Sequence, residues 1–132
     1  MNGATVKVYS LAKDGSKQLS AHFKVREFAC KDGSDTVFVS DSLVRVLEQI
    51  RAHFGKPVHI NSGYRTEAYN KSLKDASQYS QHKYGLAADI VIQGVTPAQV
   101  AAYAETLLVG TGGIGTYKSF THVDVRRTKS RW

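Results

Sequence analysis

The sequence predicts an α+β protein in which helices pack on a small, mostly antiparallel sheet. Strand-like and helix-like runs are mixed along the chain, which favours α+β over a doubly wound parallel sheet. Two strand-like runs near the end of the chain meet at the letters YKSF and predict a hairpin. The 132 residues contain no repeat, low-complexity segment or linker, so we expect a single domain over residues 1–132.

The first half of the chain predicts one strand, two short turns and one long helix. Residues 5–10 alternate like a strand, the Asp14-Gly15 pair marks a turn, and a short helical turn is expected around residues 25–28. A helix over residues 40–55 is predicted because its apolar residues share one helical face. These residues are Leu43, Val46, Leu47, Ile50 and Phe54. Ser40 or Asp41 can cap the start of this helix, and Gly55 is a typical residue at a helix end.

The second half of the chain alternates strands with helices. Strand-like runs cover residues 57–61, 86–92, 112–117 and 120–126. Helix signals cover residues 66–74 and 96–108, and in the second of these Thr96 caps the start and Pro97 takes the first helical position. The residues between 74 and 86 are expected to form a loop.

The composition limits the partners and the compartment. The net charge of +7 predicts attraction to polyanions, but no interleaved basic and aromatic residues suggest a nucleic-acid module, so we expect no nucleic-acid partner. The basic tail RRTKSRW is expected to be solvated and partly mobile. No apolar run reaches the roughly 20 residues of a transmembrane helix, and the first residues lack a signal-peptide pattern, so we expect synthesis in the cytoplasm.

Asp89 lies in an apolar run that predicts a buried strand. A buried carboxylate is costly unless it is paired or binds a metal. His82 precedes this strand, and His122 lies on the polar face of a later strand, so neighbouring strands would bring the three side chains together. Two imidazoles and one carboxylate form a competent zinc site with a free fourth position. The spacing also allows a salt bridge from Asp89 to Arg65 or Arg126, with both histidines at the surface or the edge of the core.

Three stretches, INSGYRTEAYN, SQHKYGLAADI and GGIGTYKSFTHVDVR, resemble the zinc D-Ala-D-Ala carboxypeptidase family, peptidase family M15. They are most similar to its small phage and bacterial peptidoglycan peptidases, and the resemblance covers about residues 22–126. It implies the hedgehog and D-Ala-D-Ala-peptidase type of fold. It also implies one zinc ion per chain, held by His82, Asp89 and His122.

The resemblance also implies roles for other residues. Arg65 matches an arginine that faces the substrate, where it would hold a terminal carboxylate or stabilise an oxyanion. Ser80 would contact the substrate or support its loop. Apart from the resemblance, several tyrosines lie near these motifs, and Tyr117 is the one that we expect at the substrate. Many relatives place an acidic general base three residues before the last histidine, a position taken here by Ser119. Asp124 is then expected either to act as the base or to orient a ligand.

The function expected from this resemblance is hydrolysis of peptide bonds in bacterial peptidoglycan. Release of a terminal D-Ala and cleavage within a stem or cross-link both stay open. The expected setting is phage or prophage lysis or a phage tail, with a monomer acting at the bacterial wall after release or as part of a particle. The alternative is a wall-binding module with a metal site and little turnover.

Overall fold

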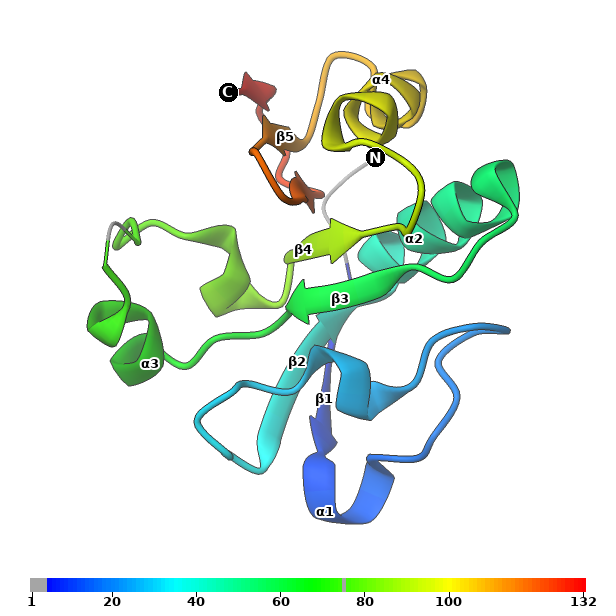
Figure 1. Cartoon of the computed structure of the whole chain (residues 1–132). Coiled ribbons are helices and arrows are strands. Elements are labelled where there is room, and N and C mark those ends of the chain that lie inside the picture. The colour runs from blue at the N-terminus through cyan, green and yellow to red at the C-terminus, as the bar shows by residue number, and fades with distance from the viewer. Residues whose placement is uncertain (1–4, 75) are drawn as a thin grey trace.

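The computed structural model describes residues 5–74 and 76–132 and contains two sheets with helices packed around them (Figure 1). The smaller sheet pairs β1 with β2 in antiparallel register. The larger sheet has the strand order β3-β4-β6-β5-β7, antiparallel except for the parallel pair of β5 and β7. The strands are β1 Val6–Ser10, β2 Thr36–Ser40, β3 His59–Ser62, β4 Ala87–Val91, β5 Gly113–Thr116, β6 Thr121–Asp124 and β7 Ser130–Arg131. The predicted α+β class is confirmed.

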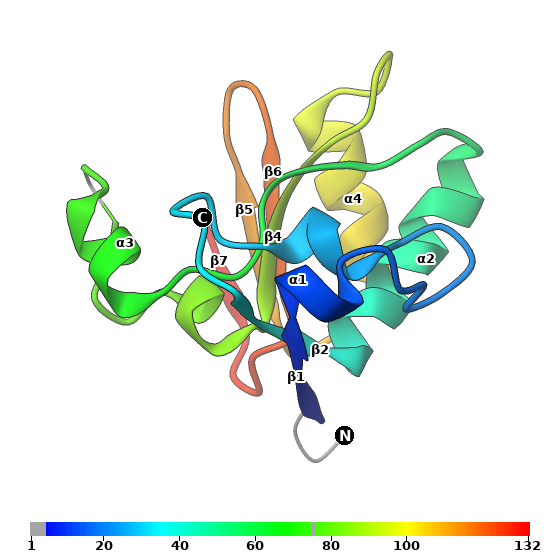
Figure 2. The ribbon, with the colours of Figure 1, turned by 90° about the horizontal axis from the view of Figure 1, so that it is seen from below.

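Four α-helices and two 3-10 helices complete the described chain. They are α1 Leu11–Asp14, η1 Val25–Phe28, α2 Asp41–Phe54, α3 Glu67–Ser72, η2 Gln81–Tyr84 and α4 Pro97–Leu107. Figure 2 shows α2 and α4 together on one side of the larger sheet, with α3 on the other side. None of these helices is long and apolar enough to cross a membrane.

The long helices begin where the sequence predicts, because side chains at their starts satisfy free backbone N–H groups. The Ser40 hydroxyl accepts a hydrogen bond from the backbone N–H of Leu43 and so caps α2. At α4, Thr96 and Gln99 form a reciprocal capping box, and Pro97 follows as the first helical residue. The apolar face of α2 is buried, which fixes this helix against the core.

The register of the larger sheet brings the predicted polar residues together. Asp89 of β4 lies directly opposite His122 of β6, and Ala87 lies opposite Asp124. Val123, between the two polar residues of β6, is fully buried in the hydrophobic core. The alternation in FTHVDVR therefore sends one face of β6 to the core and the other to a polar site.

Two segments differ from the sequence predictions. Residues 36–40 were expected to form no helix or strand, whereas they form β2, with Val37 and Val39 buried. The predicted mobile tail is wrong, because β7 pairs with β5 and Arg131 donates hydrogen bonds to three backbone carbonyls of the segment before β5. Smaller differences are one helical turn at α1 in place of a simple turn, and an α3 that ends at Ser72.

Candidate metal centre

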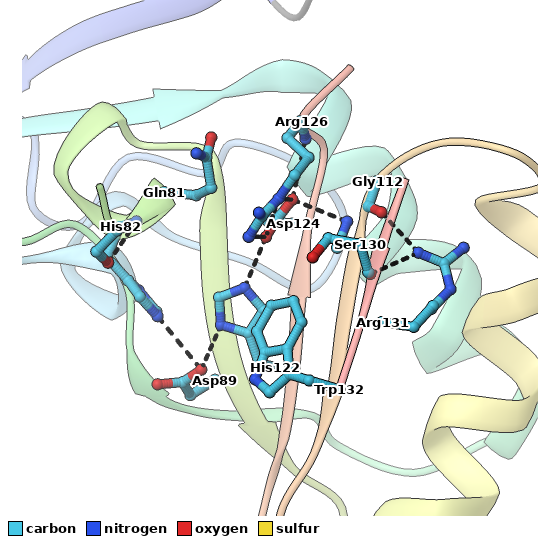
Figure 3. A network of polar contacts seen from close by, with 12 residues as sticks. Gln81, His82, Asp89, Gly112, His122, Asp124, Arg126, Ser130, Arg131 and Trp132 are labelled. Carbon is cyan, nitrogen blue, oxygen red and sulfur yellow. Dashed lines mark hydrogen bonds and ion pairs between the residues drawn. The ribbon is translucent and has the colours of Figure 1, made fainter. Parts of the chain in front are cut away.

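Three side chains from three elements meet at one point on the polar face of the larger sheet (Figure 3). His82 comes from η2, Asp89 from β4 and His122 from β6. One ligand atom from each lies within 4.8 Å of the other two. All three residues are buried, with exposed fractions of 2%, 7% and 6%. The predicted convergence of these side chains is present in the fold.

His82 is held with one ring nitrogen turned away from the meeting point. Its Nδ1 lies 2.8 Å from the carbonyl oxygen of Gly63, which can only accept a hydrogen bond. Nδ1 therefore carries the proton, and the lone pair of Nε2 faces Asp89 Oδ1 at 3.3 Å. The hydroxyl of Ser80 caps η2 by accepting a hydrogen bond from the backbone N–H of His82.

His122 is oriented in the same way by a different acceptor. Its Nε2 donates to Asp124 Oδ2 at 2.7 Å, which leaves Nδ1 facing Asp89 Oδ1 at 3.0 Å. Asp124 is fully buried and also accepts hydrogen bonds from the Arg126 guanidinium and from the backbone N–H of Gly113. A carboxylate that fixes the tautomer of a histidine is a common support for a metal ligand.

Gly113 is required for this support because Asp124 lies directly against its backbone. A Cβ at residue 113 would overlap the Asp124 carboxylate. Gly113 thus allows close packing of β5 against the carboxylate that supports His122.

The charges of the two carboxylates are strongly favoured. Burial opposes ionisation of Asp89, but its contacts with His122 and His82 outweigh that effect, so the pKa of that carboxyl lies well below its usual range. Burial likewise opposes ionisation of Asp124, and hydrogen bonds from His122 and Arg126 lower its pKa. Burial disfavours a proton on His122, yet the two carboxylates raise its pKa overall. The centre therefore favours a positive charge between the three groups.

Three acceptor atoms facing one another repel unless a cation or protons lie between them. The donor set of two imidazole nitrogens and one carboxylate oxygen suits a borderline divalent ion such as zinc. Both histidines already use their other nitrogen as a donor to a fixed acceptor, as metal-binding histidines do. The residues present therefore fit a metal ion.

Comparison with protein-family models matches residues 21–124 to the family described as Peptidase M15. The chain belongs to the peptidase M15 family. The match covers most of the chain and confirms the resemblance of the sequence motifs. A comparison with curated proteins gives no match. The molecule is therefore a peptidase, of a family whose site in this chain can hold a metal ion.

The centre of this M15 peptidase lies in a cleft of about 580 Å³. Arg65, Ser80 and Tyr117 line this cleft with the three candidate ligands. Asp124 lies behind His122, with no exposed surface and with donors on both carboxylate oxygens. Of the seven residues assigned from the sequence to the metal or the substrate, six thus line the cleft and Asp124 supports it from behind.

Arg65 connects the centre to one wall of the cleft. Its guanidinium lies 3.4 Å from Asp89 Oδ2, 3.1 Å from the Ser62 hydroxyl and 3.2 Å from Asn70 Oδ1. Asn70 is buried and donates to the backbone carbonyl of Ser77, on the loop that forms this wall. The salt bridge from Asp89 to Arg65 exists alongside the histidine contacts, so the two interpretations of Asp89 are compatible.

Two residues of the M15 peptidase site were not identified from the sequence. Asn70 lies within the quoted stretch INSGYRTEAYN, and its buried amide could have been suspected from that position. Trp132 lies in the tail that was expected to be mobile, but its ring centroid is 4.9 Å from that of His122. No local sequence pattern indicates the position of Trp132.

Proposed function

We propose that this M15 peptidase is a zinc-dependent enzyme that hydrolyses peptide bonds of bacterial peptidoglycan. The candidate reactions are release of a terminal D-Ala and cleavage within a stem peptide or cross-link. The observation that carries the proposal is the meeting of His82 Nε2, Asp89 and His122 Nδ1, with the other nitrogen of each ring held by a fixed acceptor. Three protein ligands leave the open position that hydrolysis requires.

In this proposal His82, Asp89 and His122 hold one zinc ion per chain. The ion, when bound, supplies a Lewis acid that polarises an amide carbonyl and makes water a stronger nucleophile at neutral pH. The protein holds the ligands in place before the metal arrives, because Gly63 and Asp124 fix both rings. Such a prepared site loses little conformational entropy on binding.

Arg65 is the proposed electrophilic partner for the substrate. Its side chain is 14% exposed and is held by Ser62, Asn70 and Asp89, so the guanidinium has a fixed place in the lining of the cleft. A fixed guanidinium can stabilise an oxyanion or hold the terminal carboxylate of a peptide. Ser80 and Tyr117, which line the cleft with the ligands, are the proposed further contacts to the substrate.

We assign Asp124 to the orientation of His122, one of the two roles that the sequence left open. Full burial and the hydrogen bonds to both of its oxygens support this role over that of a base in contact with water. Among the described residues that line the cleft, Asp89 is the only carboxylate.

The bacterial wall is the proposed place of action, and a phage or prophage lysis or tail protein is the proposed setting. The net charge of +7 supports association with anionic wall polymers. In this setting a monomer is sufficient, because every group assigned above comes from one chain.

The alternative function is a wall-binding module with a metal site and little turnover. Ser119 at the position of the usual acidic base, together with the burial of Asp124, favours this candidate. Both candidates predict zinc binding, so turnover alone separates them.

The test is digestion of purified peptidoglycan with and without a chelator, followed by mass spectrometry of the released peptides. Chelator-sensitive release is expected, and the new termini identify the cleaved bond. The variant Asp89→Ala should abolish release, whereas Asp35→Ala removes a carboxylate that lies outside the cleft and accepts from Ser10 and Ala12, so it should preserve release. Binding to the wall without any release in zinc-replete buffer would favour the alternative.

A further inference from the structure

The segment after β6 returns to the cleft and is firmly attached there. The Trp132 backbone N–H donates to the carbonyl of Ile114 at 3.0 Å, and its carbonyl accepts from the N–H of Thr116 at 2.8 Å. Arg131 anchors the same segment through the carboxylate of Glu105 and the backbone carbonyl of Leu108. Trp132 is therefore positioned by β5, although it lies outside the residues that match the family model.

The indole of Trp132 occupies space that Gly115 leaves open. A Cβ at residue 115 would lie only 2.5 Å from two atoms of the indole ring. The ring thus packs against the backbone of β5, beside His122, with the Arg126 guanidinium carbon 5.3 Å from its centroid. Gly115 is therefore needed for the packing of the Trp132 indole, a role that is separate from metal binding.

Trp132 and Tyr117 together form a surface of the cleft that we call the aromatic wall. The indole Nε1 donates to the Tyr117 hydroxyl at 2.6 Å, so the indole nitrogen has its partner within the wall. Tyr117 also stacks on Phe120, with ring centroids 4.4 Å apart and an angle of 12°. Trp132 is 46% exposed and Tyr117 is 41% exposed, so the wall presents ring surface to the cleft.

The opposite side of the cleft is mixed in character. Its polar residues Ser77, Ser80 and Gln81 lie in the loop before η2 and in η2 itself, and Leu73, Ala76 and Tyr79 line the cleft with them. A peptide that crosses the centre can therefore direct backbone polar groups to these polar side chains and an apolar group to the aromatic wall. The indole nitrogen is already paired, so a polar side chain against Trp132 would gain little, whereas an alkyl group would bury apolar area on both surfaces.

We propose that Trp132, together with Tyr117, forms the subsite for a small alkyl side chain of the peptide residue next to the cleaved bond. This inference rests on the proposed function and adds a specificity-determining surface to it. Loss of one methyl group from a substrate that fills an apolar subsite lowers kcat/KM by about 10-fold to 200-fold. Because the aromatic wall is half-exposed, we expect the lower end of that range.

The experiment compares two synthetic stem peptides that carry either alanine or glycine at the residue beside the bond cleaved by the wild-type enzyme. Wild type should prefer the alanine peptide by about 10-fold in kcat/KM. Trp132→Ala should lose most of that preference, mainly through a higher KM for the alanine peptide, while retaining stoichiometric zinc. Trp132→Phe, which keeps a flat apolar ring, should restore most of the preference.

The matched control is Tyr79→Ala, which removes an exposed aromatic ring from the opposite side of the same cleft and should leave the alanine preference intact. Equal loss of activity toward both peptides in Trp132→Ala, or loss of its zinc, would reduce Trp132 to a structural role and overturn the inference. Thermal melting identifies a variant that fails to fold, and Trp132→Phe then decides the question.

The proposed function is tested separately by whether wild type cleaves either peptide at all. If it cleaves neither, calorimetric titration of zinc-loaded wild type and Trp132→Ala with stem peptides ending in D-Ala-D-Ala or Gly-Gly measures the subsite directly. A preference for the alanine peptide that disappears in the variant supports the aromatic wall even without turnover. The absence of any preference in wild type refutes it.

Discussion

Replacement of Asp124 by asparagine should weaken metal binding without removing any metal ligand. Oδ1 of Asp124 accepts from the N–H groups of Gly113 and Arg126, so the amide oxygen of the substituted side chain would keep that place. The amide NH₂ would then face His122 Nε2. In the wild-type protein the carboxylate oxygen at that place accepts a hydrogen bond from His122 Nε2 at 2.7 Å. A donor there favours the tautomer with its proton on Nδ1, so the lone pair that faces Asp89 is lost.

The expected loss of zinc affinity follows from the role of the hydrogen bond between Asp124 and His122. Loss of a carboxylate that supports a metal-binding histidine lowers metal affinity by about 10-fold to 100-fold, or roughly 1.4 to 2.7 kcal/mol. We expect the upper end of this range for Asp124→Asn, because the substitution changes the tautomer of His122 and also removes one negative charge close to the ion. Arg126 loses its ionic partner as well, so the free energy of unfolding should fall in parallel.

The assay is competition for zinc with a chromogenic chelator, accompanied by circular dichroism to confirm the fold. Asp35→Asn is the matched control, because it makes the same chemical change at a carboxylate that lies outside the cleft and accepts from Ser10 and Ala12. Asp124→Asn with unchanged zinc affinity and abolished hydrolysis would refute this reasoning. That result would instead identify Asp124 as the general base.

Three further predictions concern other parts of the site and the fold. Arg65→Lys should lower kcat/KM by about 100-fold in a peptide-cleavage assay with zinc content unchanged, because lysine cannot reproduce the guanidinium fork. Gly113→Ala should lower the free energy of unfolding in urea by about 1–3 kcal/mol, because the new methyl group overlaps the Asp124 carboxylate. Glu48→Gln should cost about 1 kcal/mol at pH 7, because Glu48 accepts hydrogen bonds from the segment before η1. Burial raises the pKa of Glu48, but these hydrogen bonds lower it overall, so its contribution should disappear as the pH falls through the depressed folded-state value. Equal unfolding curves for the Glu48 variant and wild type at pH 7 would contradict this prediction.

Local patterns predicted which polar side chains share a face of the sheet, because strand alternation sets their positions, and the resemblance supplied the ligand set. His122 and Asp124 lie two residues apart, so a strand must place them on one face, and Val123 must point to the core. The polar residue in the apolar run of β4 likewise indicated that Asp89 needed a partner. The helix α2 was predicted because its apolar face follows the helical period.

Contacts between distant segments could not be predicted in this way. β7 contains only Ser130 and Arg131, which is too short to show a period, and it is formed because β5 offers a parallel edge. The position of Trp132 depends on the missing side chain of Gly115, a relationship that no sequence window contains. β2 shows alternation, but it is a short strand between a glycine-containing turn and a helix, and within the described chain it pairs with β1 alone.

Trp132 is the only tryptophan in the chain, and its ring lies 4.9 Å from the ring of a candidate metal ligand. Its fluorescence therefore reports on one place in the molecule, without any label. Copper or cobalt ions bound between the histidines would quench that emission at such short range, whereas colourless zinc would leave it bright. Tryptophan fluorescence can thus follow, in real time, whether the centre is occupied and when one metal ion replaces another.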